Sequence, residues 1–347
     1  MVLSNFLPIL LLCLTISWPA GAPLHAAQLP VLKVTAKQLP QQAVIHVPVD
    51  RELSGRITLG TPRDISAVKL WVGKSSSRAN KLPNIHRSIS SKSVMIMDAK
   101  TGETIFAKAP DNTRQPASTI KVLTGMIAIK SLEDADPVQV SPKASRMPRS
   151  KIYLDTKKTY KADDLINAVL LASANDASVA LAEKIAGSEK NFANMMTLRA
   201  KLWGAKNTIC RTASGLTAKG QQSTARDLAT IFRHAMQEDE FARRMHKRKI
   251  NTSYGQTLYN HNKALWRIKG AEAGKTGYTA AARQTYVGQF TRGEESIVVA
   301  IMGSETMWTD VKRLVDYGFK RKKQIQLAMA ETGKQENIAR INESVDL

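Results

Sequence analysis

The sequence predicts an α+β fold in three layers, an α/β/α arrangement in which helices cover both faces of one antiparallel sheet. Strand-like patterns occur at residues 93–108 and again at 266–303, near the two ends of the patterned part of the chain. Helical patterns fill the stretch between them. A chain of 347 residues with 43% hydrophobic side chains also has enough apolar surface to bury a core of this size.

Two strands are expected to form a hairpin at the start of this domain. Residues 93–98 and 103–108 are strand-like runs, and the linker at 99–102 (Ala-Lys-Thr-Gly) has the composition of a hairpin turn. Both ends of the domain should share one sheet. The later runs that are expected to join this antiparallel sheet are 266–273, 276–279, 284–290 and 296–303.

Proline, glycine and capping residues predict where the helices begin and end. Pro116 is expected to open the first helix, and Gly187 and Gly204 to stop two later ones. Thr224 and the residues after it resemble a capping box. The expected helices cover 116–130, from Asp163 or Asp164 as the cap to about 173, 176–186, 188–203, 224–237 and 308–319.

The chain is expected to divide into four segments. These are a signal peptide at 1–27, a basic and partly extended N-terminal extension at 28–92, the main domain at 93–319, and a polar C-terminal tail at 320–347. The apolar run 7–16 is too short to span a bilayer and small residues follow it, although a buried strand or helix start is the alternative. The extension contains possible strands at 43–49 and 67–72. Because the tail has no clean apolar helical face, no stable membrane anchor is expected.

The strongly basic charge indicates an anionic partner, and the cysteine content is compatible with the export that the N-terminal segment predicts. Lys and Arg total 51 against 29 Asp and Glu, a formal net charge of +22. That charge favours nucleic acid, anionic lipid or an acidic cell-wall polymer and does not choose among them. Cys13 lies in the expected signal peptide, so only Cys210 would remain and no internal disulfide could form. We expect a soluble, exported protein, which disfavours nucleic acid as the partner.

Ser118 and Lys121 form an S-x-x-K pattern early in an expected helix. Three residues turn a helix by about 300°, so the hydroxyl and the amine emerge on the same face. A desolvated, neutral lysine can take the proton of the serine and make it a nucleophile. The alternative is an ordinary helix start with an exposed lysine, and Ser66 and Lys69 match the same pattern in the N-terminal extension.

Ser173 and Asn175 form an S-x-N pattern between two expected helices. A loop of this kind can aim a hydroxyl at a nucleophile and its base, while the amide holds a backbone group of a substrate. The alternative is that the two residues only end one helix and cap the next.

Lys275, Thr276 and Gly277 open a strand that continues through Tyr278. On an edge strand beside the nucleophile, the lysine and the hydroxyl could bind a substrate carboxylate, and the glycine would let the backbone approach closely. Residues 100–102 repeat the same letters, but their place in a hairpin turn favours plain turn chemistry. The stretch before Lys275 lacks the first glycine and the strand–loop–helix context of a phosphate-binding loop.

The order and spacing of these three motifs are similar to those of penicillin-binding proteins and serine β-lactamases. Their surroundings resemble the low-molecular-weight D-alanyl-D-alanine carboxypeptidase and endopeptidase family over about residues 93–319. The stretches that carry the resemblance are 115–121, 172–176, 214–216 with 223–227, and 274–279. The resemblance implies the fold shared by β-lactamases and transpeptidases, and a periplasmic location.

The resemblance also implies acyl transfer through a covalent serine ester. Ser118 would attack the carbonyl between two D-alanines, with Lys121 as the general base. Ser173 would relay a proton toward the leaving amine, and Asn175 would orient the substrate amide. The backbone N–H groups of Ser118 and Tyr278 would form the oxyanion hole.

The ligands follow from the same resemblance. Lys275 and Thr276 would bind the terminal carboxylate of the substrate, and Lys275 would help to keep Lys121 neutral because a like charge lowers its pKa. The implied partners are peptidoglycan stem peptides that end in D-Ala-D-Ala, and β-lactams as covalent inhibitors. No metal and no cofactor is expected, because the mechanism needs none and the sequence shows no His/Cys cluster.

Arg283 departs from the family pattern, which commonly has Ala-Gly where this chain has Ala282 and Arg283. A long cation in place of glycine could narrow the site or contact an anionic peptide stem. We expect the contact, because the chain is strongly basic.

Two other functions fit parts of the sequence. A serine β-lactamase of the common class needs a carboxylate to activate the deacylating water, but no Asp or Glu occurs between Glu189 and Asp227, so only slow turnover of β-lactams is expected. A non-catalytic module for cell-wall polymer would use the net charge but would not need three catalytic motifs in register.

The sequence does not rank carboxypeptidase activity against endopeptidase activity. Because only a short stretch follows Phe319, we expect no C-terminal domain or anchor of the kind found in membrane-bound members, which would make the protein similar to the soluble periplasmic ones.

Overall fold

The computed structural model of the protein describes residues 82 and 84–345, and in the last helix it describes side chains as far as residue 331. The described residues belong to one compact unit. The expected signal peptide, the possible strands at 43–49 and 67–72, and the match at Ser66 and Lys69 lie outside the described residues.

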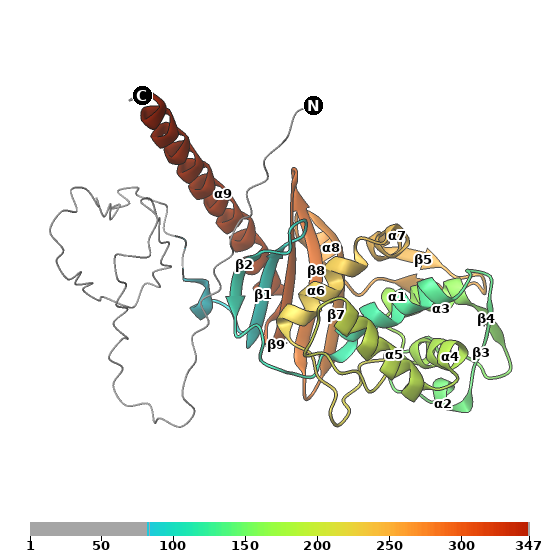
Figure 1. Ribbon diagram of the computed structural model, residues 1–347. Coiled ribbons are helices and arrows are strands. Elements are labelled where there is room, and N and C mark those ends of the chain that lie inside the picture. Colours follow the sequence, from blue (N-terminus) through green and yellow to red (C-terminus); the bar gives the residue numbers. More distant parts are fainter. Residues whose placement is uncertain (1–81, 83, 346–347) are drawn as a thin grey trace, which may run out of the picture. The chain divides into compact units, whose positions relative to one another are not determined.

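Five antiparallel strands form the central sheet in the order β2-β1-β9-β8-β7 (Figure 1). They are β1 (Ser93–Asp98), β2 (Thr104–Lys108), β7 (Ala271–Thr279), β8 (Arg283–Arg292) and β9 (Glu295–Ser304). Strands β1 and β9 pair with Val94 opposite Ile301. The prediction that both ends of the domain share one sheet is therefore confirmed, and β7 is left at an edge.

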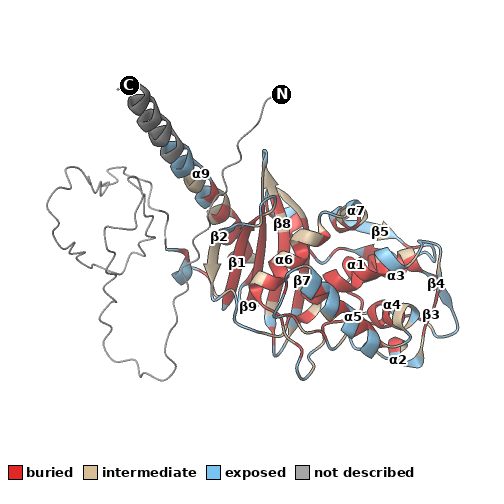
Figure 2. Ribbon diagram, viewed as in Figure 1, coloured by how far each residue is buried: buried red, intermediate tan, exposed pale blue. Residues whose placement is uncertain are grey.

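Helices cover both faces of the sheet. Successive side chains of a strand point to opposite faces, and both faces carry apolar side chains, so each face needs its own layer of helices. On β9, Val298 and Ala300 belong to one core cluster, whereas Val299 and Ile301 belong to the other. The first cluster includes residues of α1 (Lys121–Ser131), α3 (Ala162–Leu170), α4 (Asn175–Ala186) and α6 (Ala225–Ala235), and the second includes residues of α9 (Met307–Val345). Figure 2 shows β1 and β9 buried along almost their whole length. The predicted three-layer α+β class is thus confirmed.

Smaller elements complete the domain, and one of them corrects a predicted strand. They are η1 (Ile85–Arg87), η2 (Ala117–Ile120), α2 (Pro142–Ser145), α5 (Glu189–Leu202), α7 (Asp239–His246), α8 (Ala264–Arg267), and the hairpins β3 (Pro137–Gln139) with β4 (Thr159–Lys161) and β5 (Lys249–Asn251) with β6 (Thr257–Tyr259). The prediction of a strand over 266–273 is wrong at its start, since Trp266 lies in α8. Gly270, at a φ of +86°, turns the chain just before β7 begins. From Ala271 onward, the two strands expected at 266–273 and 276–279 form the single strand β7.

The helix caps confirm one expected boundary and move another. Thr224 caps α6 by accepting a hydrogen bond from the backbone N–H three residues later, as its pattern predicts. The helix that Asp163 or Asp164 was expected to cap begins earlier, at Ala162, so both acids lie in its first turn. The Asp164 carboxylate instead accepts hydrogen bonds from Ser253 N at 3.0 Å and Ser253 Oγ at 2.5 Å.

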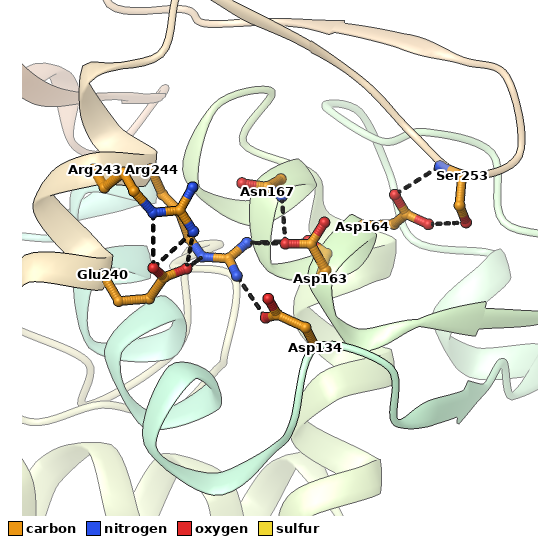
Figure 3. A network of polar contacts seen from close by, with 8 residues as sticks. All are labelled: Asp134, Asp163, Asp164, Asn167, Glu240, Arg243, Arg244 and Ser253. Atoms are coloured by element: carbon orange, nitrogen blue, oxygen red, sulfur yellow. Dashed lines mark hydrogen bonds and ion pairs between the residues drawn. The ribbon is translucent and has the colours of Figure 1, made fainter.

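An ion-pair network around the buried Arg244 ties α7 to the rest of the helical layer (Figure 3). The Arg244 side chain is only 1% exposed, and it donates to Glu240 and Asp134, each at 2.6 Å, and also to Asp163. Three carboxylates therefore compensate one buried cation, which a cation needs in order to lie in the protein interior. This network holds α7, a short polar helix that the sequence analysis did not predict, against α3.

The last helix is longer than expected. A helix over 308–319 and then a polar tail were predicted, but α9 continues without a break to Val345. Most of the residues that follow are good helix formers and none is a proline, so the helix continues even through Gly333. Lys322 anchors the extension through ion pairs with Asp98, at 2.6 Å, and Glu295. In the part of the chain that the structure describes, no helix is both long and apolar enough to cross a membrane.

Asp310, near the start of α9, fastens the segment that leads into β1. Its buried carboxylate accepts hydrogen bonds from Ser90 N at 3.1 Å and Ser91 N at 2.8 Å, and from the hydroxyls of both serines. Ile85 and Ile89 lie just before these serines in the second core cluster. Packing onto the domain therefore begins before residue 93. The segment boundaries given above otherwise remain predictions.

Replacing Asp310 by Ala should lower the free energy of unfolding by about 3 kcal/mol, because buried donors lose a charged acceptor. Burial alone would raise the pKa of Asp310, but hydrogen bonds from Ser91 and Ser90 outweigh it and hold the pKa below its usual value. The contribution of the carboxylate is therefore present above the unfolded-state pKa and is lost as the pH falls through the lower folded-state pKa.

Urea unfolding of both proteins, from about pH 7 down to about pH 2, measures this contribution. A difference between wild type and variant below about 1 kcal/mol at neutral pH, or one that does not shrink in acid, contradicts it.

Candidate active site

Ser118 and Lys121 lie at the junction of η2 and α1. Because η2 ends at Ile120 and α1 begins with Lys121, the two side chains are one helical turn apart and emerge on the same side. Lys121 Nζ lies 2.9 Å from Ser118 Oγ. The serine reaches a surface cavity, whereas the lysine is fully buried.

Two acceptors hold the amine of Lys121 from other parts of the fold. Asn175 Oδ1 accepts from Lys121 Nζ at 2.7 Å, and Ser214 O accepts from it at 2.6 Å. The Asn175 amide is oriented for this contact, because its Nδ2 donates to Pro148 O at 2.9 Å. Its backbone N–H is held as well, by Ser150 O at 2.7 Å.

A neutral amine satisfies these contacts without a buried, unpaired charge. Its two N–H groups donate to Asn175 Oδ1 and Ser214 O, and its lone pair remains for the Ser118 hydroxyl. Burial lowers the pKa of Lys121 well below its usual value and the charge of Lys275 lowers it further, against the opposite effect of Asp176. This lowering favours the uncharged form of the amine that Ser118 contacts.

Lys275 holds the second serine of the site. This lysine projects from β7, is 1% exposed, and donates through Nζ to Ser173 Oγ at 2.8 Å. Burial lowers the pKa of Lys275 to about 7, so the amine changes charge near neutral pH. Ser173 has a φ of +60°, a conformation in which a residue other than glycine is strained.

Two glycines let the backbone approach Ser118 from two sides. A Cβ on Gly277 of β7 would lie 2.8 Å from Ser118 N, and one on Gly215 would lie 2.0 Å from Ala117 O. Neither contact is possible for a larger residue without a shift of the backbone. The edge strand and the turn at 214–216 therefore enclose the serine at a distance that only glycine allows.

One cavity of about 570 Å³ joins these groups. Its lining includes Ser118, Ser173, Asn175, Thr276, Gly277 and Tyr278, and the two lysines, Lys121 and Lys275, are buried beside it. The structure thus brings together every residue singled out in the three motifs. No Asp or Glu is among the described residues that line this cavity.

Several groups that build the site lie outside the three sequence motifs. Residues 214–216 counted only toward the resemblance, although the carbonyl of Ser214 is a direct partner of Lys121. A backbone carbonyl has no residue-type signal, so only the fold reveals it. His261 also lines the cavity; partial desolvation and the nearby Lys275 lower its pKa to about 4, so the ring is neutral at pH 7.

Two other sequence features, a second Lys-Thr-Gly stretch and a free cysteine, belong to the scaffold of the fold and not to the active site. Residues 100–102 lie in the turn between β1 and β2, where Asp98 Oδ1 accepts from Lys100 N at 2.7 Å and Thr101 N at 2.9 Å, which confirms the turn interpretation. Cys210 is buried, and burial raises the pKa of its thiol to about 12. It is therefore not a thiolate nucleophile.

The expectation that Arg283 presents a free cation to the cavity is wrong. Its guanidinium pairs with Glu305, with Nε donating to Oε1 at 2.9 Å, and Arg283 is not among the residues that line the cavity. Its φ of +56° explains why glycine suits this position in the family pattern. The expected contact with an anionic stem is corrected on this ground, because the charge is already compensated by a neighbouring carboxylate.

Comparisons with known proteins agree on one family. A family model described as D-alanyl-D-alanine carboxypeptidase matches residues 77–306. The chain is 34% identical over 236 residues to D-alanyl-D-alanine carboxypeptidase DacB2 of Mycobacterium tuberculosis, a match that covers 65% of this chain and 81% of that protein. It is 29% identical over 251 residues to DacC of Escherichia coli, which covers 67% of this chain and 62% of DacC.

Solved structures show the same fold. A D-alanyl-D-alanine carboxypeptidase from Mycobacterium tuberculosis superimposes with a TM-score of 0.64 at 32% identity, over 66% of this chain and 91% of that one. Ampicillin-bound Penicillin-Binding Protein D2 from Listeria monocytogenes gives a TM-score of 0.61 at 25% identity, over 67% and 98%. These likenesses confirm the fold class independently of the sheet order.

Replacing Lys275 by Met should move the acid limb of acylation to higher pH. Acylation requires uncharged Lys121, so its rate falls as the pH drops through the pKa of that amine. The charge of Lys275 lowers this pKa, so its removal raises the pKa and leaves more of Lys121 protonated at pH 6 than in the wild type. Rates of attachment of a fluorescent β-lactam between about pH 5 and pH 9 measure the shift.

Ser173→Ala is the matched control, since it removes the hydroxyl that Lys275 contacts but leaves the amine in place. Its acid limb should stay where the wild type has it. An unshifted limb in Lys275→Met, or an equal shift in both variants, refutes the coupling between the two lysines.

Proposed function

The chain belongs to the D-alanyl-D-alanine carboxypeptidase family, and from this membership we propose that it hydrolyses peptidoglycan stem peptides ending in D-Ala-D-Ala through a covalent serine ester. The observation that carries the proposal is the contact of 2.9 Å between Ser118 Oγ and the buried amine of Lys121. A hydroxyl is a weak nucleophile until an adjacent base accepts its proton, and this amine is placed to accept it.

Acylation begins with Ser118. Its Oγ forms a bond to the carbonyl carbon between the two D-alanines while its proton passes to Lys121 Nζ. The backbone N–H groups of Ser118 and Tyr278 stabilise the oxyanion, a contribution worth about 3 kcal/mol for each donor. The carbon–nitrogen bond then breaks, Ser173 Oγ passes its proton to the amine of the departing D-alanine, and the proton held by Lys121 replaces it on Ser173. Lys121 is then neutral again. A water attacks the ester carbonyl and gives a proton to Lys121 Nζ, which returns it to Ser118 Oγ as the acyl group leaves as a carboxylic acid.

The terminal carboxylate of the substrate couples binding to nucleophile activation. Thr276 lines the cavity beside the buried amine of Lys275, so a carboxylate bound there favours the protonated form of that amine. The positive charge on Lys275 in turn favours neutral Lys121. Asn175 still has one N–H on Nδ2 beyond its bond to Pro148, and this N–H donates to the carbonyl on the acyl side.

β-Lactams would enter the same pathway and stop at the ester. Penicillin-Binding Protein D2, a structural relative, was solved with ampicillin and with cefotaxime bound. Since no carboxylate lines the cavity within the described residues, a general base of that kind is missing for rapid hydrolysis of the acyl-enzyme. This supports slow release of β-lactams over the β-lactamase alternative.

The site of action would be the cell wall outside the cytoplasm. The resemblance of residues 1–27 to a signal peptide supports export to the periplasm. The formal net charge of +22 supports residence next to an acidic polymer and fits stem peptides as partners.

Ser118→Ala should abolish both stem-peptide hydrolysis and covalent labelling by fluorescent penicillin, with a loss of at least about 10³-fold in kcat. In wild type, mass spectrometry should show one adduct per chain, located on Ser118, that persists for many minutes. Digestion of monomeric pentapeptide stems beside cross-linked dimers separates carboxypeptidase from endopeptidase activity.

Cys210→Ser is the control, because it removes the thiol of the described residues and should label like the wild type. Labelling that survives Ser118→Ala, or rapid repeated turnover of penicillin, contradicts the proposed function.

A further inference from the structure

A second hollow of about 390 Å³ lies beside the catalytic cavity. One wall is the loop at 149–153, and the other is the stretch 256–259 of the β5–β6 hairpin. Arg149, Ser150 and His261 line both hollows, so the two are continuous. We call this second hollow the side groove.

The side groove carries positive charge that no carboxylate of the described residues pairs with. Arg149 Nε donates to the hydroxyl of Tyr153 at 2.8 Å, and Lys151 Nζ donates to Ser145 O at 3.1 Å, both neutral partners. Neither cation forms an ion pair with a described carboxylate, and no Asp or Glu lines the groove. This contrasts with Arg283, whose charge Glu305 balances.

Two exposed tyrosines border the groove. Tyr153 is 58% exposed and Tyr259 is 62% exposed. Two cations lie close to the Tyr153 ring. The Lys151 amine is 5.3 Å and the Arg149 guanidinium is 5.7 Å from the ring centroid. Rings of this kind can pack against the aliphatic part of a side chain that ends in a charged group.

The groove is held in shape by the catalytic motif itself. Asp176 follows Asn175 directly, and its carboxylate accepts hydrogen bonds from Ile152 N and Leu154 N. Asn175 N donates to Ser150 O at 2.7 Å. The loop is therefore fixed to the side of the cavity where Asn175 would hold the acyl part of a substrate.

The opposite wall is also anchored. Ser253, in the turn between β5 and β6, donates to the Asp164 carboxylate through both its N–H and its hydroxyl (Figure 3). Asp164 lies in the first turn of α3, next to Asp163, which pairs with the buried Arg244. Both walls are thus preformed, which reduces the entropy that a bound peptide would have to lose.

We propose that the side groove binds a side-chain carboxylate of the peptide, on the acyl side of the scissile bond, through Arg149 and Lys151. This inference rests on the proposed function, since it names the part of the substrate that precedes the D-Ala-D-Ala terminus. The enzyme would thereby prefer acidic stem peptides to neutral ones of the same shape.

Two acetylated tripeptides test the preference. Both end in D-Ala-D-Ala, and their first residue is L-2-aminopimelic acid or its side-chain amide, which differ only in the charged group. Binding is measured to the Ser118→Ala protein, so that the readout does not depend on hydrolysis. The carboxylate peptide should bind about fivefold more tightly at low ionic strength, and the ratio should fall toward one in high salt.

Arg149→Gln, in the same background, should reduce this ratio to near one, and Lys151→Gln should reduce it in part. Arg146→Gln is the matched control, because it removes the same charge from an exposed position three residues away that lines neither hollow. It should keep the ratio. Thermal unfolding of each variant verifies that the loop change has not unfolded the domain.

Equal binding of the two peptides by the parent protein, a ratio that survives Arg149→Gln, or an equal loss in Arg146→Gln each overturns the side-groove proposal. Hydrolysis of the same peptides by the protein with Ser118 intact is recorded separately. Failure to cleave either peptide overturns the proposed function, and it leaves the binding ratios to decide the groove.

Discussion

The active site depends on one buried lysine amine, that of Lys121, whose pKa burial lowers well below its usual value. Among the described residues, no carboxylate forms a hydrogen bond with Lys121 Nζ. Its contacts are Ser118 Oγ, Asn175 Oδ1 of α4 and the carbonyl of Ser214. Burying an ammonium ion without a paired carboxylate is costly in free energy, so burial favours the neutral amine of Lys121 over its protonated form. Every segment that reaches the site is therefore arranged around an amine that can accept the proton of Ser118.

Backbone strain is concentrated around that amine. Five residues other than glycine have a positive φ among the described residues. Two of them, Ser173 and Tyr153, line the cavity or its side groove, and a third, Ala117, directly precedes Ser118. Strain of this kind persists only where packing over-determines it. The central sheet and the helical cluster provide that packing, with the fully buried side chains of β9 facing both layers. Stability in the core thus maintains an unfavourable but precise arrangement at the surface.

The sequence predicts the parts of the protein that depend on local patterns. The main sheet, most helices and the three motifs follow from runs, caps and spacings of a few residues, and the structure places all the motif residues around one cavity. It does not predict what depends on distant contacts. The Ser214 carbonyl has no residue-type signature. Gly270, between α8 and β7, lies so close to β8 that a Cβ there would be 2.2 Å from Thr291 O. The ion pairs of Lys322 hold α9 beyond its expected end. The pairing of Arg283 with Glu305 is a long-range contact of the same kind.

The protonation state of Lys121 can be observed directly by ¹⁵N NMR of its side-chain amine, assigned by comparison with a Lys121→Arg variant. The structure predicts a titration well below the ordinary lysine value of 10.5, with Nζ uncharged when Ser118 reacts. A titration near 10.5 would mean that the buried amine is a permanent ammonium ion, and Ser118 would then need another base.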